Sequence, residues 1–157
     1  MNVQVALAKA TRPCAAITPR WRRVFCMIED QYRNLSVAAN ACEGIFTIAA
    51  VTLELGTTPN WLTAALPGDD EWRIEWYKFY YGLDLAHAFA VTGDAKYRRT
   101  WKQLVRSWIA QMPAGCDSSD VAARRITNWI YAWNAFSRAR EFEADFEDEI
   151  VSHLGAE

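Results

Sequence analysis

Hydrophobic positions recur about every three to four residues along most of the chain, which is the repeat of a helix face. The repeat predicts a first helix from about residue 19 to residue 40, because Thr18 and Pro19 form a helix-start signal ahead of it. Its apolar positions are Trp21, Phe25, Ile28, Tyr32 and Leu35. Residues 1 to about 17 show no clear pattern.

Residues 44–56 interrupt the helical repeat. The segment is rich in β-branched residues, and Gly44 and Gly56 bound it. This composition favours an extended segment or a short hairpin. Turn-forming residues follow at 57–61 and at 66–70.

The strongest helical pattern begins at Asp70, which can cap a helix. One side of this helix carries Trp72, Trp76, Phe79, Tyr80, Leu83, His87 and Ala90. The other side is apolar too, which is typical of a buried helix. We expect a single helix that ends at Thr92, where Gly93 suits a left-handed stop.

Three more helices are predicted after Gly93. Asp94 caps a one-sided helix that ends near Met112, with Tyr97, Trp101, Leu104, Val105, Trp108 and Ile109 inside. Residues 118–120 cap another helix to about residue 138, with Val121, Ile126, Trp129, Trp133 and Phe136 inside. A last helix begins near Ala144. Short turns join these helices, so we predict an all-α chain of consecutive antiparallel helical hairpins.

Composition narrows the function classes. The chain has 157 residues, which predicts one domain, and 52% of them are hydrophobic. Its 17 basic and 19 acidic residues leave a net charge of −2, so we expect no nucleic-acid partner. No apolar run is long enough to span a membrane, and no signal peptide is visible. The four cysteines and two histidines have no metal-site spacing, so we predict neither a metal nor a cofactor.

Aromatic residues are the distinctive part of the composition. Eight Trp, six Tyr and seven Phe suit a large core, an interface or a groove that stacks sugars or bases. Composition alone leaves these three uses open.

Three segments together resemble the heparinase II/III-like family of polysaccharide lyases, in its N-terminal helical domain. They are residues 44–56 (GIFTIAAVTLELG) with Pro59-Asn-Trp61, residues 71–86 (EWRIEWYKFYYGLDLA) with Thr92-Gly-Asp94 and Ser107-Trp-Ile109, and residues 122–133 (AARRITNWIYAW). The likeness runs from about residue 40 to residue 138, in the order and spacing of the family.

This resemblance implies part of an incomplete α/α toroid whose cleft holds an acidic, uronate-containing polysaccharide. Such lyases cleave by β-elimination, and their catalytic Asn, His and Tyr lie further along the toroid and in the following β-sandwich. We therefore expect residues 1–157 to be one domain, the N-terminal part of the toroid, without catalytic residues of its own. The remaining toroid and the β-sandwich would be its partners. The family is mostly periplasmic or exported, whereas cysteines without a pairing pattern favour a reducing compartment, so the compartment stays open.

Five residues are candidates for substrate binding: Arg73, Trp76, Tyr80, Arg125 and Asn128. An arginine can grip a carboxylate or sulfate with paired donors, an asparagine adds a directional hydrogen bond, and aromatic rings stack on sugars. Arg124, Asn128 and Tyr131 form an adjoining row on the helix.

Each candidate also has a structural alternative. Arg125 could pair with Asp84 or Glu75, Asn128 could tie helix ends together, and the Trp and Tyr stripe could be plain core. The whole chain also has alternatives to a lyase domain. It could be a non-catalytic carbohydrate-binding module or a structural helical bundle. The polysaccharide itself cannot be identified from these residues.

Overall fold

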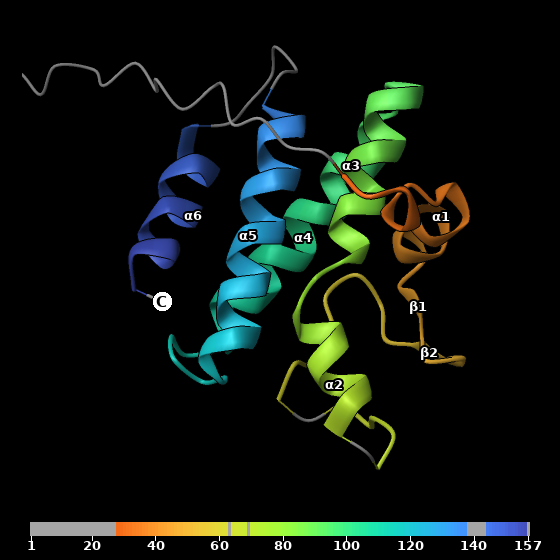
Figure 1. Cartoon of the computed structure of the whole chain (residues 1–157). Coiled ribbons are helices and arrows are strands. Elements are labelled where there is room, and N and C mark those ends of the chain that lie inside the picture. Colours follow the sequence, from red (N-terminus) through yellow and green to blue (C-terminus); the bar gives the residue numbers. More distant parts are fainter. Residues whose placement is uncertain (1–27, 63, 69, 138–143, 157) are drawn as a thin grey trace, which may run out of the picture.

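The computed structural model describes residues 28–62, 64–68, 70–137 and 144–156, and these are mostly helical (Figure 1). The prediction of an all-α chain is thereby confirmed. The elements are the 3-10 turn η1 (Asp30–Tyr32), α1 (Leu35–Cys42), β1 (Ile45–Ile48), β2 (Val51–Glu54), α2 (Asp70–Tyr77), α3 (Tyr81–Thr92), α4 (Ala95–Gln111), α5 (Ser119–Phe136) and α6 (Ala144–Ala156). Helix α3 is central and contacts α1, α4 and α5, while α6 lies on the outer side of α5 (Figure 1). Within the described ranges, no helix is both long and apolar enough to cross a bilayer.

The segment bounded by glycines forms the predicted hairpin. Strands β1 and β2 pair antiparallel, with Ile48 opposite Val51. Gly44 is irreplaceable at the base, because its φ is +74° and a Cβ there would lie 2.3 Å from Gly56 Cα. At the other end, Ala49 and Ala50 form the two-residue turn with φ of 48° and 64°. Two-residue turns of this kind favour Asn and Gly, so the alanines leave the tip strained.

The helices after Gly93 agree with the sequence pattern. Gly93 is left-handed, with φ of 71°, and Asp94 accepts a hydrogen bond from the Lys96 amide at the start of α4. Phe146 and Ile150 bury α6 against the core. The fully buried side chains of α4 and α5 include Trp101, Leu104, Val105, Trp108, Ala132 and Phe136. Two predicted core positions, Ile109 and Ile126, are half-buried rather than buried.

The helix predicted from Asp70 to Thr92 is two helices, which corrects the sequence-based expectation. Helix α2 ends at Tyr77 and α3 begins at Tyr81. Between them Phe79 adopts a left-handed conformation with φ of 59°, and its side chain is fully buried. Its ring lies 5.3 Å from that of Trp61, 5.6 Å from Trp108 and 5.3 Å from Trp129. Packing from three distant parts of the chain therefore offsets the backbone strain at this position.

The predicted first helix is also corrected. The helix of the described residues begins at Leu35, because Asn34 is extended and its Oδ1 accepts hydrogen bonds from the amides of Ser36 and Val37. Residues 19–27 of the predicted helix lie outside the described residues. Residues 138–143, which precede the last helix, lie outside them too.

A buried carboxylate holds the start of α1 against α3. Asp84 is 3% exposed, and its Oδ1 accepts a 2.8 Å hydrogen bond from the Asn34 amide. Burial raises the pKa of Asp84 from 3.8 to about 6, although the Asn34 hydrogen bond lowers it. The folded protein therefore holds this proton more tightly than the unfolded chain does.

The titration of Asp84 makes stability depend on pH. Between about pH 4 and pH 6 the Asp84 carboxyl binds more protons in the folded state than in the unfolded state, so its contribution to the free energy of unfolding falls as pH rises through this window. We expect Asp84→Asn, whose Oδ1 can still accept from Asn34, to flatten this slope and to stabilise the protein at pH 7 by about 1–3 kcal/mol. Urea unfolding from pH 4 to pH 7 measures both effects. The exposed Asp148→Asn is the control, and a slope that Asp84→Asn leaves unchanged would contradict the assignment.

The hairpin tip provides a second stability test. Ala50→Gly should raise the free energy of unfolding by about 0.5–1 kcal/mol, because glycine adopts positive φ without a Cβ clash. Ala39→Gly on the exposed face of α1 should lower it by a similar amount. Chemical denaturation of the two variants side by side measures the difference, and equal losses in both would show that the tip is unstrained.

Candidate functional site

A polar groove of about 360 Å³ lies between η1, the start of α3 and one side of α5. Its α5 wall includes Arg124, Asn128 and Tyr131, which follow each other at successive turns. The lining residues are Glu29, Gln31, Tyr32, Tyr80, Leu83, Arg124, Thr127, Asn128 and Tyr131. We refer to this cavity as the polar groove.

Two stacked phenol rings form the opposite wall. The rings of Tyr32 and Tyr80 lie 4.5 Å apart and are nearly parallel, with an angle of 4° between them. Burial and, after it, the neighbouring Tyr80 raise the pKa of Tyr32 to about 12. The Tyr32 hydroxyl is therefore neutral at physiological pH. It can donate a hydrogen bond, but it is poorly suited to remove a proton.

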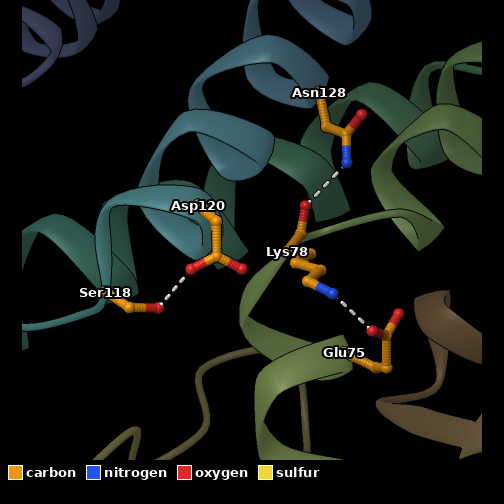
Figure 2. Close-up of polar contacts among 5 residues, drawn as sticks. All are labelled: Glu75, Lys78, Ser118, Asp120 and Asn128. Carbon is orange, nitrogen blue, oxygen red and sulfur yellow. Dashed lines mark hydrogen bonds and ion pairs between the residues drawn. The ribbon is translucent and has the colours of Figure 1, made fainter.

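Asn128 connects the groove to the break between α2 and α3. Its Nδ2 donates a 2.7 Å hydrogen bond to the backbone carbonyl of Lys78, which the broken helix leaves without a helical partner (Figure 2). The Lys78 ammonium in turn lies 2.5 Å from Glu75, and this contact raises the pKa of Lys78. The Asn128 side chain is thus held in one orientation by the backbone, which is the helix-tying role that the sequence left open.

The first turn of α5 faces the same break. Ser118 donates a 2.7 Å hydrogen bond to the Asp120 carboxylate, and this bond is the main reason why the pKa of Asp120 is lowered (Figure 2). Lys78 lowers this pKa as well, through its positive charge. Opposite charges therefore meet where α2, α3 and α5 come together.

Arg125 lies inside the protein. It is 1% exposed, it forms an ion pair with Asp117, and its guanidinium carbon lies 4.2 Å from the centre of the Trp108 ring. The sequence alternative of a structural ion pair therefore describes its environment, although the acid is Asp117 and neither Asp84 nor Glu75. In this arrangement the guanidinium has no surface to offer a ligand.

Arg73 and Trp76 lie away from the polar groove. Arg73 is exposed, pairs with Asp70 and lines a different cavity together with Tyr77 and Asp117. Trp76 is fully buried, and its ring stacks on that of Trp61 at 4.3 Å. The break at residues 78–80 explains the separation, because Arg73 and Tyr80 would share a face only on an unbroken helix.

Of the five sequence candidates, the structure brings Tyr80 and Asn128 together. Arg124 lines the same groove and is its cationic residue. It is exposed and forms no ion pair within the described ranges. The sequence already indicated that Arg124, Asn128 and Tyr131 share one side of the helix, because they are spaced four and then three residues apart. Tyr32 gave no such signal, because it was expected to be an apolar position of a long helix.

The geometry defines a helical domain with a polar, aromatic groove, and comparisons with known proteins identify its family. The model of the heparinase II/III N-terminus matches residues 27–153. The chain belongs to this family, as the resemblance of its three segments predicted. No curated protein is similar enough in sequence to match.

Solved structures support the same fold. The crystal structure of the heparan sulfate lyase HepC from Pedobacter heparinus matches with a TM-score of 0.67 and 21% identity, over 89% of this chain and 23% of that one. The crystal structure of a mutant of that lyase matches with a TM-score of 0.67 and 20% identity, over the same shares of the two chains. At this identity the likeness establishes the helical fold of the N-terminal domain. The chain spans about a quarter of the length of that lyase.

Two neighbouring arginines on α5 allow a direct test of these placements. We expect Arg125→Ala to lower the free energy of unfolding by about 3 kcal/mol or more, because it empties a fully buried site and leaves the largely buried Asp117 carboxylate without its partner. Arg124→Ala should change it by less than about 0.5 kcal/mol, because the side chain is exposed. Thermal and urea unfolding measure both. Similar small effects in the two variants would contradict the buried position of Arg125.

Proposed function

We propose that this chain is the N-terminal part of the toroid domain of a polysaccharide lyase, and that its polar groove holds part of an acidic, uronate-containing polysaccharide. The observation that supports this most directly is the row of Arg124, Asn128 and Tyr131 facing the stacked Tyr32 and Tyr80. Family membership supplies the lyase context. The rest of the toroid and a β-sandwich would complete the cleft.

The groove offers the contacts that an acidic sugar requires. Arg124 can bind a carboxylate or sulfate with two parallel donors, and the Tyr131 hydroxyl can bond to a sugar hydroxyl. Asn128 is 3% exposed and already donates to the Lys78 carbonyl, so it would hold this side of α5 in place and not contact the sugar widely. The edge or face of Tyr80 can cover the apolar side of a sugar ring. Together these contacts would fix the orientation of one sugar against α5.

The elimination chemistry needs more than this groove contains. A lyase must neutralise the uronate carboxylate, remove the neighbouring proton and protonate the leaving oxygen. The high pKa of Tyr32 makes it a poor base at neutral pH. We therefore propose that this chain binds and orients the polysaccharide, while catalytic residues come from the remaining domains.

The other sequence candidates then take supporting roles. Arg125 would set the position of α5 through Asp117, and Trp76 would anchor α2 in the core through Trp61. Arg73 would lie outside the sugar contacts described here. A binding module without catalysis is the second candidate function, since the groove contacts do not depend on a catalytic group.

Activity of the protein with its remaining domains tests the proposal. Digestion of heparan sulfate, alginate or another uronate polymer should produce the ultraviolet absorbance of unsaturated uronic ends. Arg124→Ala should lower kcat/KM by about 10–100-fold, because a hydrogen bond to a charged group contributes about 1.5–3 kcal/mol.

The control replaces an arginine of similar exposure on another helix. Arg99→Ala on α4 should leave kcat/KM unchanged, and both variants should keep the wild-type melting temperature. No absorbance from any uronate polymer would count against a lyase. Binding of the polymer without cleavage, weakened by Arg124→Ala, would instead support the carbohydrate-binding module.

A further inference from the structure

A second cavity, of about 320 Å³, adjoins the Tyr32–Tyr80 stack between α1, β1 and the start of α3. We refer to it as the acidic pocket, because two carboxylates, Asp84 and Glu75, are among its lining residues. It shares Tyr32 and Tyr80 with the polar groove. The residues that matter for its chemistry are Tyr32, Phe46, Glu75, Tyr80, Tyr81 and Asp84.

The carboxylate of Asp84 is buried and incompletely satisfied. Its exposure is 3%, and the 2.8 Å bond from the Asn34 amide to Oδ1 is its one hydrogen bond within the part of the chain that the structure describes. No cationic side chain perturbs its ionisation. Buried carboxylates are ordinarily paired with a cation or with several donors. Asp84 therefore presents an acceptor to the pocket that the described residues leave without a charged partner.

Aromatic rings form much of the pocket around Asp84. The ring centres of Phe46 and Tyr81 lie 4.9 Å apart in an edge-on arrangement, and Tyr32 and Tyr80 stack at 4.5 Å. The faces of aromatic rings attract cations, and several rings around one cavity are the usual recognition site of organic ammonium groups. Both the rings and the carboxylate thus favour a positive ligand.

The second carboxylate is already partly neutralised. Glu75 lies 2.5 Å from the Lys78 ammonium, so it contributes little net charge. Asp84 carries no such partner, and it would repel an anionic sugar. The ligand class must therefore differ from that of the polar groove next to it.

We propose that the acidic pocket binds a small organic ammonium ion, with the ammonium at Asp84 and the apolar body against Phe46 and Tyr81. A volume of about 320 Å³ is at the lower end of small-molecule sites, which range over about 300–1,000 Å³. The ligand is therefore of the size of a single ring or a short aliphatic amine. This site is independent of the proposed lyase function.

Three probes of similar shape and different charge test the proposal by calorimetry on the purified protein. Benzylammonium should bind at least about 10-fold more tightly than benzyl alcohol, because a hydrogen bond to a charged group contributes about 1.5–3 kcal/mol. Benzoate should bind more weakly than either. Asp84→Asn should lower the affinity for benzylammonium about 10-fold or more and leave that for benzyl alcohol unchanged. Asp148→Asn, on exposed α6, should alter neither.

Amide chemical shifts of the wild-type protein provide a second measurement that needs no variant. Benzylammonium should shift the amides of Asn34, Phe46 and Tyr81 and leave those of α6 unchanged. Equal affinities for the three probes, shifts outside the acidic pocket or no binding at millimolar concentration would each overturn the proposal. If Asp84→Asn does not fold, the order of the three wild-type affinities and the shift map decide it.

Discussion

A guanidinium group is unstable inside an apolar core without an acidic partner. Arg125 is buried in this core, and residues from two other parts of the chain pack against its guanidinium. Asp117 provides the negative charge from the loop before α5, and the Trp108 ring provides a cation-binding face from α4. One turn further along α5, Asn128 meets the backbone carbonyl of Lys78. The inward polar residues of one helix thus fix both the α4–α5 loop and the break between α2 and α3.

Because Arg125 is buried, a ligand at the surface of α5 can contact only its exposed neighbours. The next row on α5 begins with Arg124 and faces the stacked Tyr32 and Tyr80. Two adjacent arginines therefore lie in opposite environments, one inside the core and one on the groove. The helix break contributes as well, because it turns Tyr80 toward α5 while Trp76 stays in the core against Trp61.

The sequence was informative where local patterns decide the structure. The one-sided repeat of α4, the cap at Asp94 and the glycines around the hairpin are short-range signals, and all three were interpreted correctly from the sequence. The cap at Asn34 is short-range too, but it was missed because residues 19–40 were expected to form one helix. The left-handed Phe79 gave no such signal, because its strain is offset by rings more than fifteen residues away in the chain. Tyr80 and Asn128 could be chosen as candidate residues because they belong to helical patterns. Tyr32 could not, because its contact with Tyr80 joins residues that are far apart in the chain.

The charge of the groove also limits what this chain can contribute to polysaccharide binding. Among the described residues that line it, Arg124 is the only cation, and Glu29 opposes it. One hydrogen bond to a charged group contributes about 1.5–3 kcal/mol, whereas even millimolar affinity requires about 4 kcal/mol. Tyr80 stacking can add about 0.5–1.5 kcal/mol, by analogy with aromatic pairs, so the two contacts together reach at best about millimolar affinity. Under the proposed function, most of the affinity for an acidic polymer would have to come from cationic groups on other domains, and this groove would chiefly fix the orientation of one sugar.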